Sequence, residues 1–185
     1  PMAKELKVPM GMSEDCHQRI LSKNGADYFL GIDIEIFSDG EILTRIGDEK
    51  VLLLATPGHD EGQLSIYPEN LSWMIVSDLI QTVGTVVIGA PEGDMKKYFD
   101  SLEKVIGMGP KVVIPSHGIA LGGVDKLRAT LEHRKMRERK IIELMSEKKT
   151  EEEMLHIIYA DIDERLYPYA RKTISAHLKK IRDEM

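Results

Sequence analysis

Val51-Leu52-Leu53-Leu54-Ala55-Thr56-Pro57-Gly58-His59-Asp60 is the most informative segment of the sequence, because a continuous apolar run is followed, after a short turn, by a histidine. Five apolar residues bounded by turn residues predict a strand that is buried on both faces. Two later stretches repeat the arrangement, one ending in Asp78 and one in His117. A packed strand fixes the backbone while the residue after it projects past the sheet edge. The three strand ends therefore predict one shared site.

The residue types at these strand ends indicate a metal. Imidazole and carboxylate groups are ligands that suit zinc and neighbouring first-row metals. The alternative for each residue alone is ordinary: a single histidine after a turn is more often a hydrogen-bonded surface residue, and a single Asp78 is a strand-end or helix-capping carboxylate. The agreement of three such positions favours His59, Asp78 and His117 as metal ligands. The sequence identifies no separate catalytic residue and no organic cofactor site.

Composition describes a globular protein with one sizeable core and a small appendix. The chain has 185 residues, 42% of them hydrophobic and 30% charged. No apolar run approaches the roughly 20 residues that span a bilayer, and no signal stretch is present, so we expect no membrane partner. The single Cys16 excludes an internal disulfide and is interpreted as a bystander thiol. A reducing compartment, and hence the cytoplasm, is the expected location.

The charge distribution predicts two domains. Ten lysines and arginines stand against nineteen aspartates and glutamates up to Asp125, and fifteen stand against twelve from Lys126 on. The change coincides with a change from strand-like to helical texture, so we expect one domain over residues 1–124 and a helical tail over 125–185. The first residue, Pro1, is interpreted as a cut or processed end.

Local patterns predict the elements in some detail. Capping and turn residues bound a helix over 13–22 and a helix over 95–108 that begins at Asp94. Apolar segments between turns predict the strands. They cover 28–32, 34–37, 42–46, 51–55, 64–67, 73–76 and, as the last strand, 112–114. We interpret 78–91 as a loop that lines a site, and predict tail helices over 124–147, 151–159 and 168–181. The expected architecture is a mixed sheet with helices on one outer side.

The ordered series of short motifs carries a family resemblance. It consists of Thr56-Pro57-Gly58-His59, Ser77-Asp78, the helix that begins Gly93-Asp94-Met95 and Ser116-His117-Gly118. Over residues 32–122 this series resembles the second half of the metallo-β-lactamase superfamily domain. The tail, through Leu131-Glu132-His133-Arg134-Lys135, 150–154 and 170–181, resembles the small winged-helix-like tail of β-lactamase-like hydrolases in that superfamily. The resemblance implies an α/β fold: the second half of an αββα sandwich followed by that tail.

The resemblance also implies a role for each site residue. His59 would bind the first of two zinc ions, His117 the second, and Asp78 would bridge both, so that the metals activate a water for hydrolysis. Ser77 stands where the family usually has glycine, and Asp60 where it often has threonine. The family's His-x-His-x-Asp-His motif does not occur in this sequence. We therefore expect a truncated domain with an incomplete metal site and little activity alone.

Three functions remain open from the sequence. The first is a metal-dependent hydrolase of a small-molecule ester, thioester or phosphodiester. The second is a non-catalytic binding or scaffold module. The third is nucleic-acid binding by the tail, through Lys172, Lys179, Lys180 and Arg182 beside His177, which the acidic stretch Glu151-Glu152-Glu153 argues against. An apolar sheet face over 51–55 and 73–76, exposed in a half-domain, predicts a homodimer or a bound N-terminal fragment.

Overall fold

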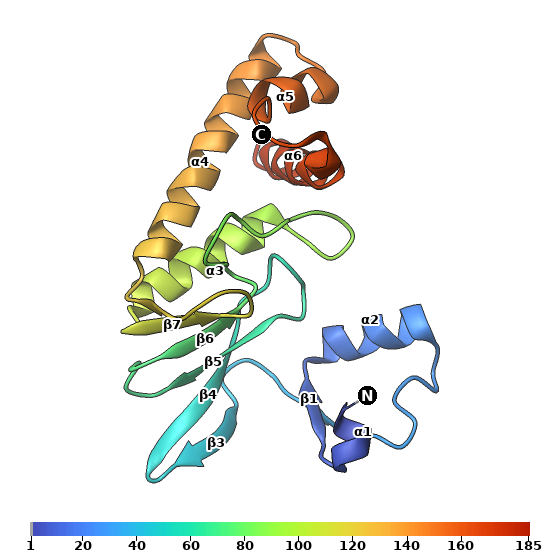
Figure 1. Cartoon of the computed structure of the whole chain (residues 1–185), viewed down its shortest axis with the longest axis vertical. Coiled ribbons are helices and arrows are strands. Elements are labelled where there is room, and N and C mark those ends of the chain that lie inside the picture. Colours follow the sequence, from blue (N-terminus) through green and yellow to red (C-terminus); the bar gives the residue numbers. More distant parts are fainter. Residues whose placement is uncertain (1) are drawn as a thin grey trace.

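The computed structural model describes residues 2–185, so the interpretation of Pro1 lies outside the described residues. The elements in chain order are α1 (Met2–Leu6), β1 (Met10–Met12), α2 (Glu14–Asn24), β2 (Ile34–Ile36), β3 (Ile42–Ile46), β4 (Glu49–Ala55), β5 (Leu64–Pro68), β6 (Met74–Ser77), α3 (Met95–Met108), β7 (Val112–Pro115), β8 (Leu121–Gly122), α4 (Asp125–Ser146), α5 (Glu151–Ile158), a 3₁₀ turn (Glu164–Leu166) and α6 (Tyr167–Asp183). A six-stranded sheet is covered on one side by α3, α4–α6 extend beyond α3, and the N-terminal segment with α1, β1 and α2 lies beside the sheet (Figure 1). None of the helices in the described part of the chain is both long and apolar enough to cross a membrane.

The sheet is mixed, as the sequence predicts. Its strand order is β3-β4-β5-β6-β7-β8, and all neighbours are antiparallel except β6 and β7. The parallel pair follows from the connection, because α3 lies between the two strands in the chain and returns it to the starting edge. As a result β4, β6 and β7 all run in the same direction.

Helix α3 packs on one face of the sheet. Asp94 accepts a hydrogen bond from Lys97 N at the helix start, and Gly109 ends the helix in a left-handed conformation (φ 68°). Its buried face includes Tyr98 and Leu102, which pack with Met74 and other sheet residues in the main core. The predicted bounds of this helix are confirmed.

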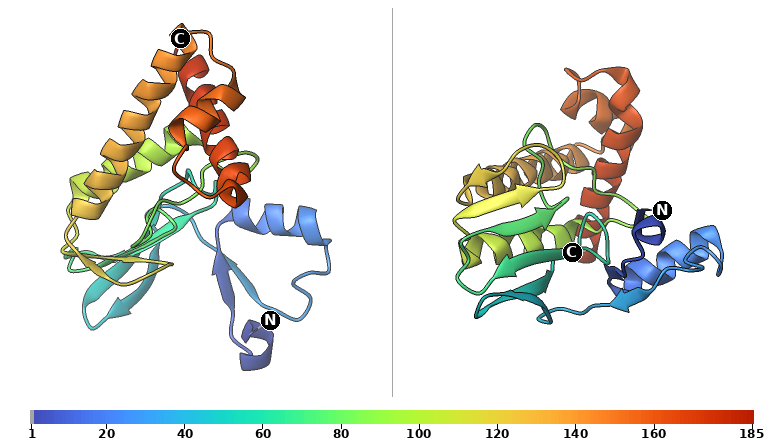
Figure 2. Two further views of the ribbon diagram at one scale, coloured as in Figure 1. Left: turned by 45° about the horizontal axis from the view of Figure 1, so that its top comes forward. Right: turned by 60° about the horizontal axis from the view of Figure 1, so that its bottom comes forward.

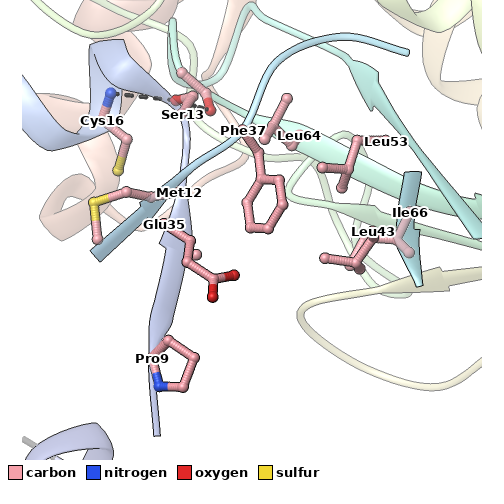
Figure 3. Close-up of a pocket in the computed structure, with 12 residues that line it drawn as sticks. Pro9, Met12, Ser13, Cys16, Glu35, Phe37, Leu43, Leu53, Leu64 and Ile66 are labelled. Carbon is pink, nitrogen blue, oxygen red and sulfur yellow. Dashed lines mark hydrogen bonds between the residues drawn. The ribbon is translucent and has the colours of Figure 1, made fainter. Parts of the chain in front are cut away.

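The opposite face of the sheet borders a cavity of about 500 Å³. The sheet contributes Leu43, Leu53, Leu64 and Ile66, while β1, α2 and β2 contribute the other wall (Figure 3). The Phe37 ring points into the space between the two walls. Cys16 lines this cavity, and burial raises the pKa of its thiol.

The prediction that 51–55 and 73–76 form an exposed patch is wrong for these strands. Val51, Leu53 and Met74 are buried, and Ile75 is half-buried. Residues 9–37 lie over part of the sheet face that carries Leu53, and α3 covers the opposite face, which carries Met74. The prediction of burial on both faces holds for β4 in part, since Leu52 and Ala55 remain half-buried.

The C-terminal helices form a second core. Helix α4 leaves the sheet layer, and α5 and α6 pack against its far half (Figure 2). Ile141, Leu155 and Ile174 are buried at their centre. Thr150 and Glu153 form a reciprocal capping box that starts α5. All three predicted tail helices are present.

Some element predictions are wrong. Residues 28–32 form turns rather than a strand, although Phe29 is buried against the His17 ring. The strand over 112–114 is not the last, because β8 follows it and pairs with it. The two-stranded parallel sheet of β1 and β2 was not predicted, because a three-residue Met-Gly-Met strand carries no periodic signal.

Candidate metal centre

Strand direction brings the three predicted ligands to one edge of the sheet. Because β4, β6 and β7 are parallel to one another, the residues that follow them emerge at the same edge. His59 follows β4 after a short turn, Asp78 follows β6 directly, and His117 follows β7. The sheet therefore assembles side chains that are up to 58 positions apart in the chain.

The three side chains meet at Asp78. His59 Nε2 lies 3.9 Å from Asp78 Oδ2, and His117 Nε2 lies 3.5 Å from Asp78 Oδ1. The side chains of His59 and Asp78 are about one-third exposed, whereas that of His117 is mostly exposed. The carboxylate thus stands between two imidazoles at the surface of the molecule. Their closeness agrees with the sequence prediction, and their role as metal ligands stays a prediction.

A backbone contact selects the tautomer of the neutral His59 ring. Its Nδ1 lies 2.9 Å from the carbonyl oxygen of Val87. A carbonyl oxygen only accepts, so Nδ1 carries the proton and donates it. In the neutral ring, Nε2 then presents a lone pair toward Asp78. A ring nitrogen held by a backbone carbonyl is the usual support of a metal-binding histidine.

The backbone around Asp78 is held from three sides. Ser77 Oγ donates to Leu64 O, Ser116 N donates to Ser77 O, and Tyr98 Oη donates to Leu79 O at 2.7 Å. Ser77 itself has a left-handed φ of 50°, a conformation that glycine adopts more readily. Asp78 Oδ1 is buried and has no hydrogen-bond partner.

The turn before His59 packs tightly on α3. Gly58 has a φ of 135°, and a Cβ placed there would overlap the backbone of Tyr98. Asp94 N donates to Gly58 O at 2.9 Å, which ties the turn to the start of the helix. Packing therefore requires glycine at position 58. On the other side of His59, Asp60 forms an ion pair with Arg19 at 2.5 Å.

A cavity of about 300 Å³ adjoins His59. Arg19, Asp60 and the segment around Val87 line it, together with Tyr169 and Lys172 from α6. The C-terminal helix therefore contributes to the surroundings of the candidate ligand. Sequence reasoning missed Tyr169, and considered Lys172 only as a phosphate contact. No local pattern signals either role, because α6 reaches this place through tertiary packing alone.

Two imidazole nitrogens and one carboxylate are ligand types that bind zinc and similar divalent metals. Asp78 Oδ1 has no hydrogen-bond partner, and His59 Nε2 faces the other oxygen of the same carboxylate, Oδ2; a cation beside this carboxylate would stabilise these acceptors. Two ligand atoms on one tetrahedral zinc ion lie about 3.4 Å apart, so the 3.5 Å separation of His117 from Asp78 fits such a site and the 3.9 Å separation of His59 from Asp78 is slightly longer. Among residues 2–185, however, no group of three or more such side chains has the arrangement of a formed metal site.

The other histidines have different surroundings. His133 is half-buried, His156 pairs with Glu152 on the exposed side of α5, and His177 is fully buried with Nδ1 3.0 Å from Glu138. The expectation that His177 lies on a nucleic-acid-facing surface is wrong, because α4 and α3 cover it. Most cations of α6 are paired with carboxylates, such as Lys179 with Asp94.

Comparison with known proteins bears on the whole chain. Residues 2–117 match the family model "Metallo-beta-lactamase superfamily", and residues 150–184 match "Beta-lactamase associated winged helix domain". The chain is similar to the Beta-lactamase-like protein 2 homolog of Caenorhabditis elegans, with 30% identity over 154 residues, 82% of this chain and 51% of that protein. Its Drosophila melanogaster counterpart is 27% identical over 72% of this chain and 46% of that protein. The chain thus spans about half the length of these curated relatives.

Solved structures share the fold. A metallo-beta-lactamase family protein from Thermus thermophilus superimposes with a TM-score of 0.73 at 17% identity, covering 96% of this chain and 67% of that one. TTHA1623, solved in a di-iron-bound form, gives a TM-score of 0.54 at 20% identity, covering 70% of this chain and 67% of that one. The α/β fold with a C-terminal winged-helix region is therefore shared with known proteins.

Proposed function

Because the chain belongs to the metallo-beta-lactamase superfamily, with a winged helix domain associated with it, we propose that it forms part of a metal-dependent hydrolase. His59, Asp78 and His117 would be the metal ligands, and a small-molecule ester, thioester or phosphodiester would be the substrate. One observation carries the proposal: two imidazoles lie 3.5 and 3.9 Å from one carboxylate that has an orphaned buried oxygen.

The bound metal would lower the pKa of a coordinated water and polarise the bond to be cleaved. The chain's own residues would hold that chemistry in place. Asp78 supplies the negative charge, and the Val87 carbonyl keeps the Nε2 lone pair of His59 directed toward it. Lys172, exposed beside His59 and free of ion pairs among the described residues, would orient an anionic substrate group.

The centre in this chain is incomplete for two metals. Three ligands suffice for one open catalytic site, whereas a second ion needs further donors. In the family that this sequence resembles, the other ligands come from a His-x-His-x-Asp-His motif, and that motif does not occur in this sequence. We propose that this chain corresponds to the second half of the αββα sandwich, and that zinc and full activity belong to the longer protein.

A homodimer or a bound N-terminal fragment stays a proposal. Residues 9–37 already lie over part of the sheet face, and between them and Leu53, Leu64 and Ile66 a cavity of about 500 Å³ remains unfilled. We propose that apolar side chains from an N-terminal half, or from a second copy of the chain, enter this space in solution. The proposed setting is the cytoplasm.

Activity of the full-length protein tests the hydrolase proposal. With zinc supplied, we expect it to hydrolyse bis(p-nitrophenyl) phosphate or a p-nitrophenyl ester. Asp78→Asn should lower kcat/KM by about 100-fold or more, while Asp100→Asn on the exposed side of α3 should leave it unchanged. Equal activity of the Asp78→Asn and Asp100→Asn variants would contradict the proposal.

A further inference from the structure

A third cavity, of about 580 Å³, lies between α4, α5 and the segment Gly84–Thr85. We propose that it binds the phosphate group of a ligand. Lys126, His133 and Arg137 line it from α4, and Tyr159 and Ile162 form the apolar wall. None of the three candidate metal ligands lines this cavity, so the proposal does not depend on the metal centre.

The cations of the cavity converge because of helix geometry. Lys126, His133 and Arg137 are seven and four positions apart, and side chains at these spacings share one face of a helix. The chain folds this face toward α5 instead of into solvent, so all three side chains are half-buried. The result is a concave surface with two positive charges from Lys126 and Arg137 and the titratable ring of His133, beside the single carboxylate of Asp161.

These cations lack carboxylate partners. Elsewhere on α4, Lys135 pairs with Glu103 at 2.8 Å and Lys140 with Glu143 at 2.9 Å. Within residues 2–185, neither Lys126 nor Arg137 has a carboxylate oxygen within 4.0 Å, and Asp161, which also lines the cavity, forms no ion pair. The positive charge in the cavity is therefore left for a ligand to neutralise.

The pKa of His133 is also affected by the cations that line the cavity. Burial lowers the pKa of its ring, and the positive charges of Arg137, Arg134 and Lys126 lower it further. Burial is the larger cause of this shift, and the neighbouring positive charges add to it in the same direction. A bound anion would oppose this effect and raise the pKa of His133.

The two permanent cations are already positioned. The guanidinium of Arg137 lies 4.2 Å from the centre of the Tyr159 ring, which restrains it by a cation–π contact. Lys126 Nζ lies 3.4 Å from Gly84 O. A restrained guanidinium offers paired N–H donors that match two phosphate oxygens, and the lysine ammonium adds a point charge. The apolar wall would contact whatever carries the phosphate.

Phosphate binding tests the inference directly. We expect saturable binding of inorganic phosphate by calorimetry, together with an upward shift of the His133 pKa followed by NMR. Lys126→Gln and Arg137→Gln should each weaken binding about tenfold, and Arg137→Lys should weaken it less. Arg139→Gln is the matched control, because Arg139 is exposed on the same helix and does not line the cavity.

Melting temperatures establish that each variant is folded. No saturable binding of phosphate by the folded wild-type chain would overturn the proposal, as would equal binding by the Arg137→Gln and Arg139→Gln variants. Adenosine monophosphate and a ten-nucleotide oligoadenylate then separate the two sources of such a phosphate. Equal affinity supports a small phosphorylated molecule, whereas tighter, steeply salt-dependent binding of the oligonucleotide that Arg137→Gln weakens supports a phosphodiester chain.

Discussion

The hydroxyl of Tyr98 donates a 2.7 Å hydrogen bond to the carbonyl of Leu79, the residue that follows Asp78. Tyr98 lies on α3 and is fully buried, so the contact fixes the candidate metal centre to the helix that covers the sheet. The backbone of the same tyrosine abuts Gly58, next to His59. One residue of α3 thus supports two of the three candidate ligands.

Tyr98→Phe is predicted to lower the free energy of unfolding by about 1–3 kcal/mol, because the buried Leu79 carbonyl would lose its partner. Urea denaturation measures this change. An unchanged free energy of unfolding would show that another donor replaces the hydroxyl.

Alkaline pH provides a second prediction for Tyr98. Burial raises the pKa of its phenol to about 12 in the folded protein, against an ordinary value of 10.0. The unfolded chain releases the proton first, so this contribution is complete below pH 10 and falls as pH rises toward 12. Wild type should therefore lose more stability than Tyr98→Phe between these pH values. Parallel losses in urea denaturation would contradict the assignment.

Gly58→Ala is predicted to destabilise the fold by more than about 2 kcal/mol, because a Cβ there would overlap the Tyr98 backbone and strain a positive φ. Gly107→Ala is the matched control. Gly107 is within α3 with open space around its Cβ position, so alanine should stabilise by about 0.5–1 kcal/mol. Thermal unfolding distinguishes these opposite signs, and equal effects would refute the packing argument.

Acid should act on His177. Its burial lowers the pKa of the imidazole below the ordinary 6.5, although Glu138 opposes the shift. The unfolded chain then binds the proton more readily, so this contribution is complete above pH 6.5 and is lost as pH falls below it. His177→Gln should reduce the pH dependence of the unfolding free energy between pH 7 and 5. A pH dependence equal to that of wild type would exclude His177 as its source.

Much of the fold follows from local signals in the sequence. Asp94 and Gly109 bound α3 as predicted, and Thr150 starts α5 as part of a capping box. Residues 28–32 could not be recognised as turns from their apolar composition, because only Phe29 is buried, through a tertiary contact with His17, whereas Tyr28 and Leu30 are exposed. Strand β1 depends on pairing with β2, more than twenty positions away, which no local pattern encodes.

The candidate site was predictable to a similar extent. The proximity of His59, Asp78 and His117 follows from apolar strands that end at one sheet edge. The Val87 carbonyl that holds His59 lies in an irregular loop, and Tyr169 arrives from α6. Both contacts result from tertiary packing, so the sequence pattern contains no sign of them.

The proposed metal role of His59, Asp78 and His117 is tested by a zinc titration of the full-length protein, followed by NMR of the histidine side chains. We expect zinc to shift the ring resonances of His59 and His117 together and saturably, and Asp78→Asn to abolish the effect. The exposed His156 serves as the internal control, since it pairs only with Glu152. If zinc leaves His59 and His117 unchanged, or shifts His156 at the same concentrations, the account of these residues as metal ligands is contradicted.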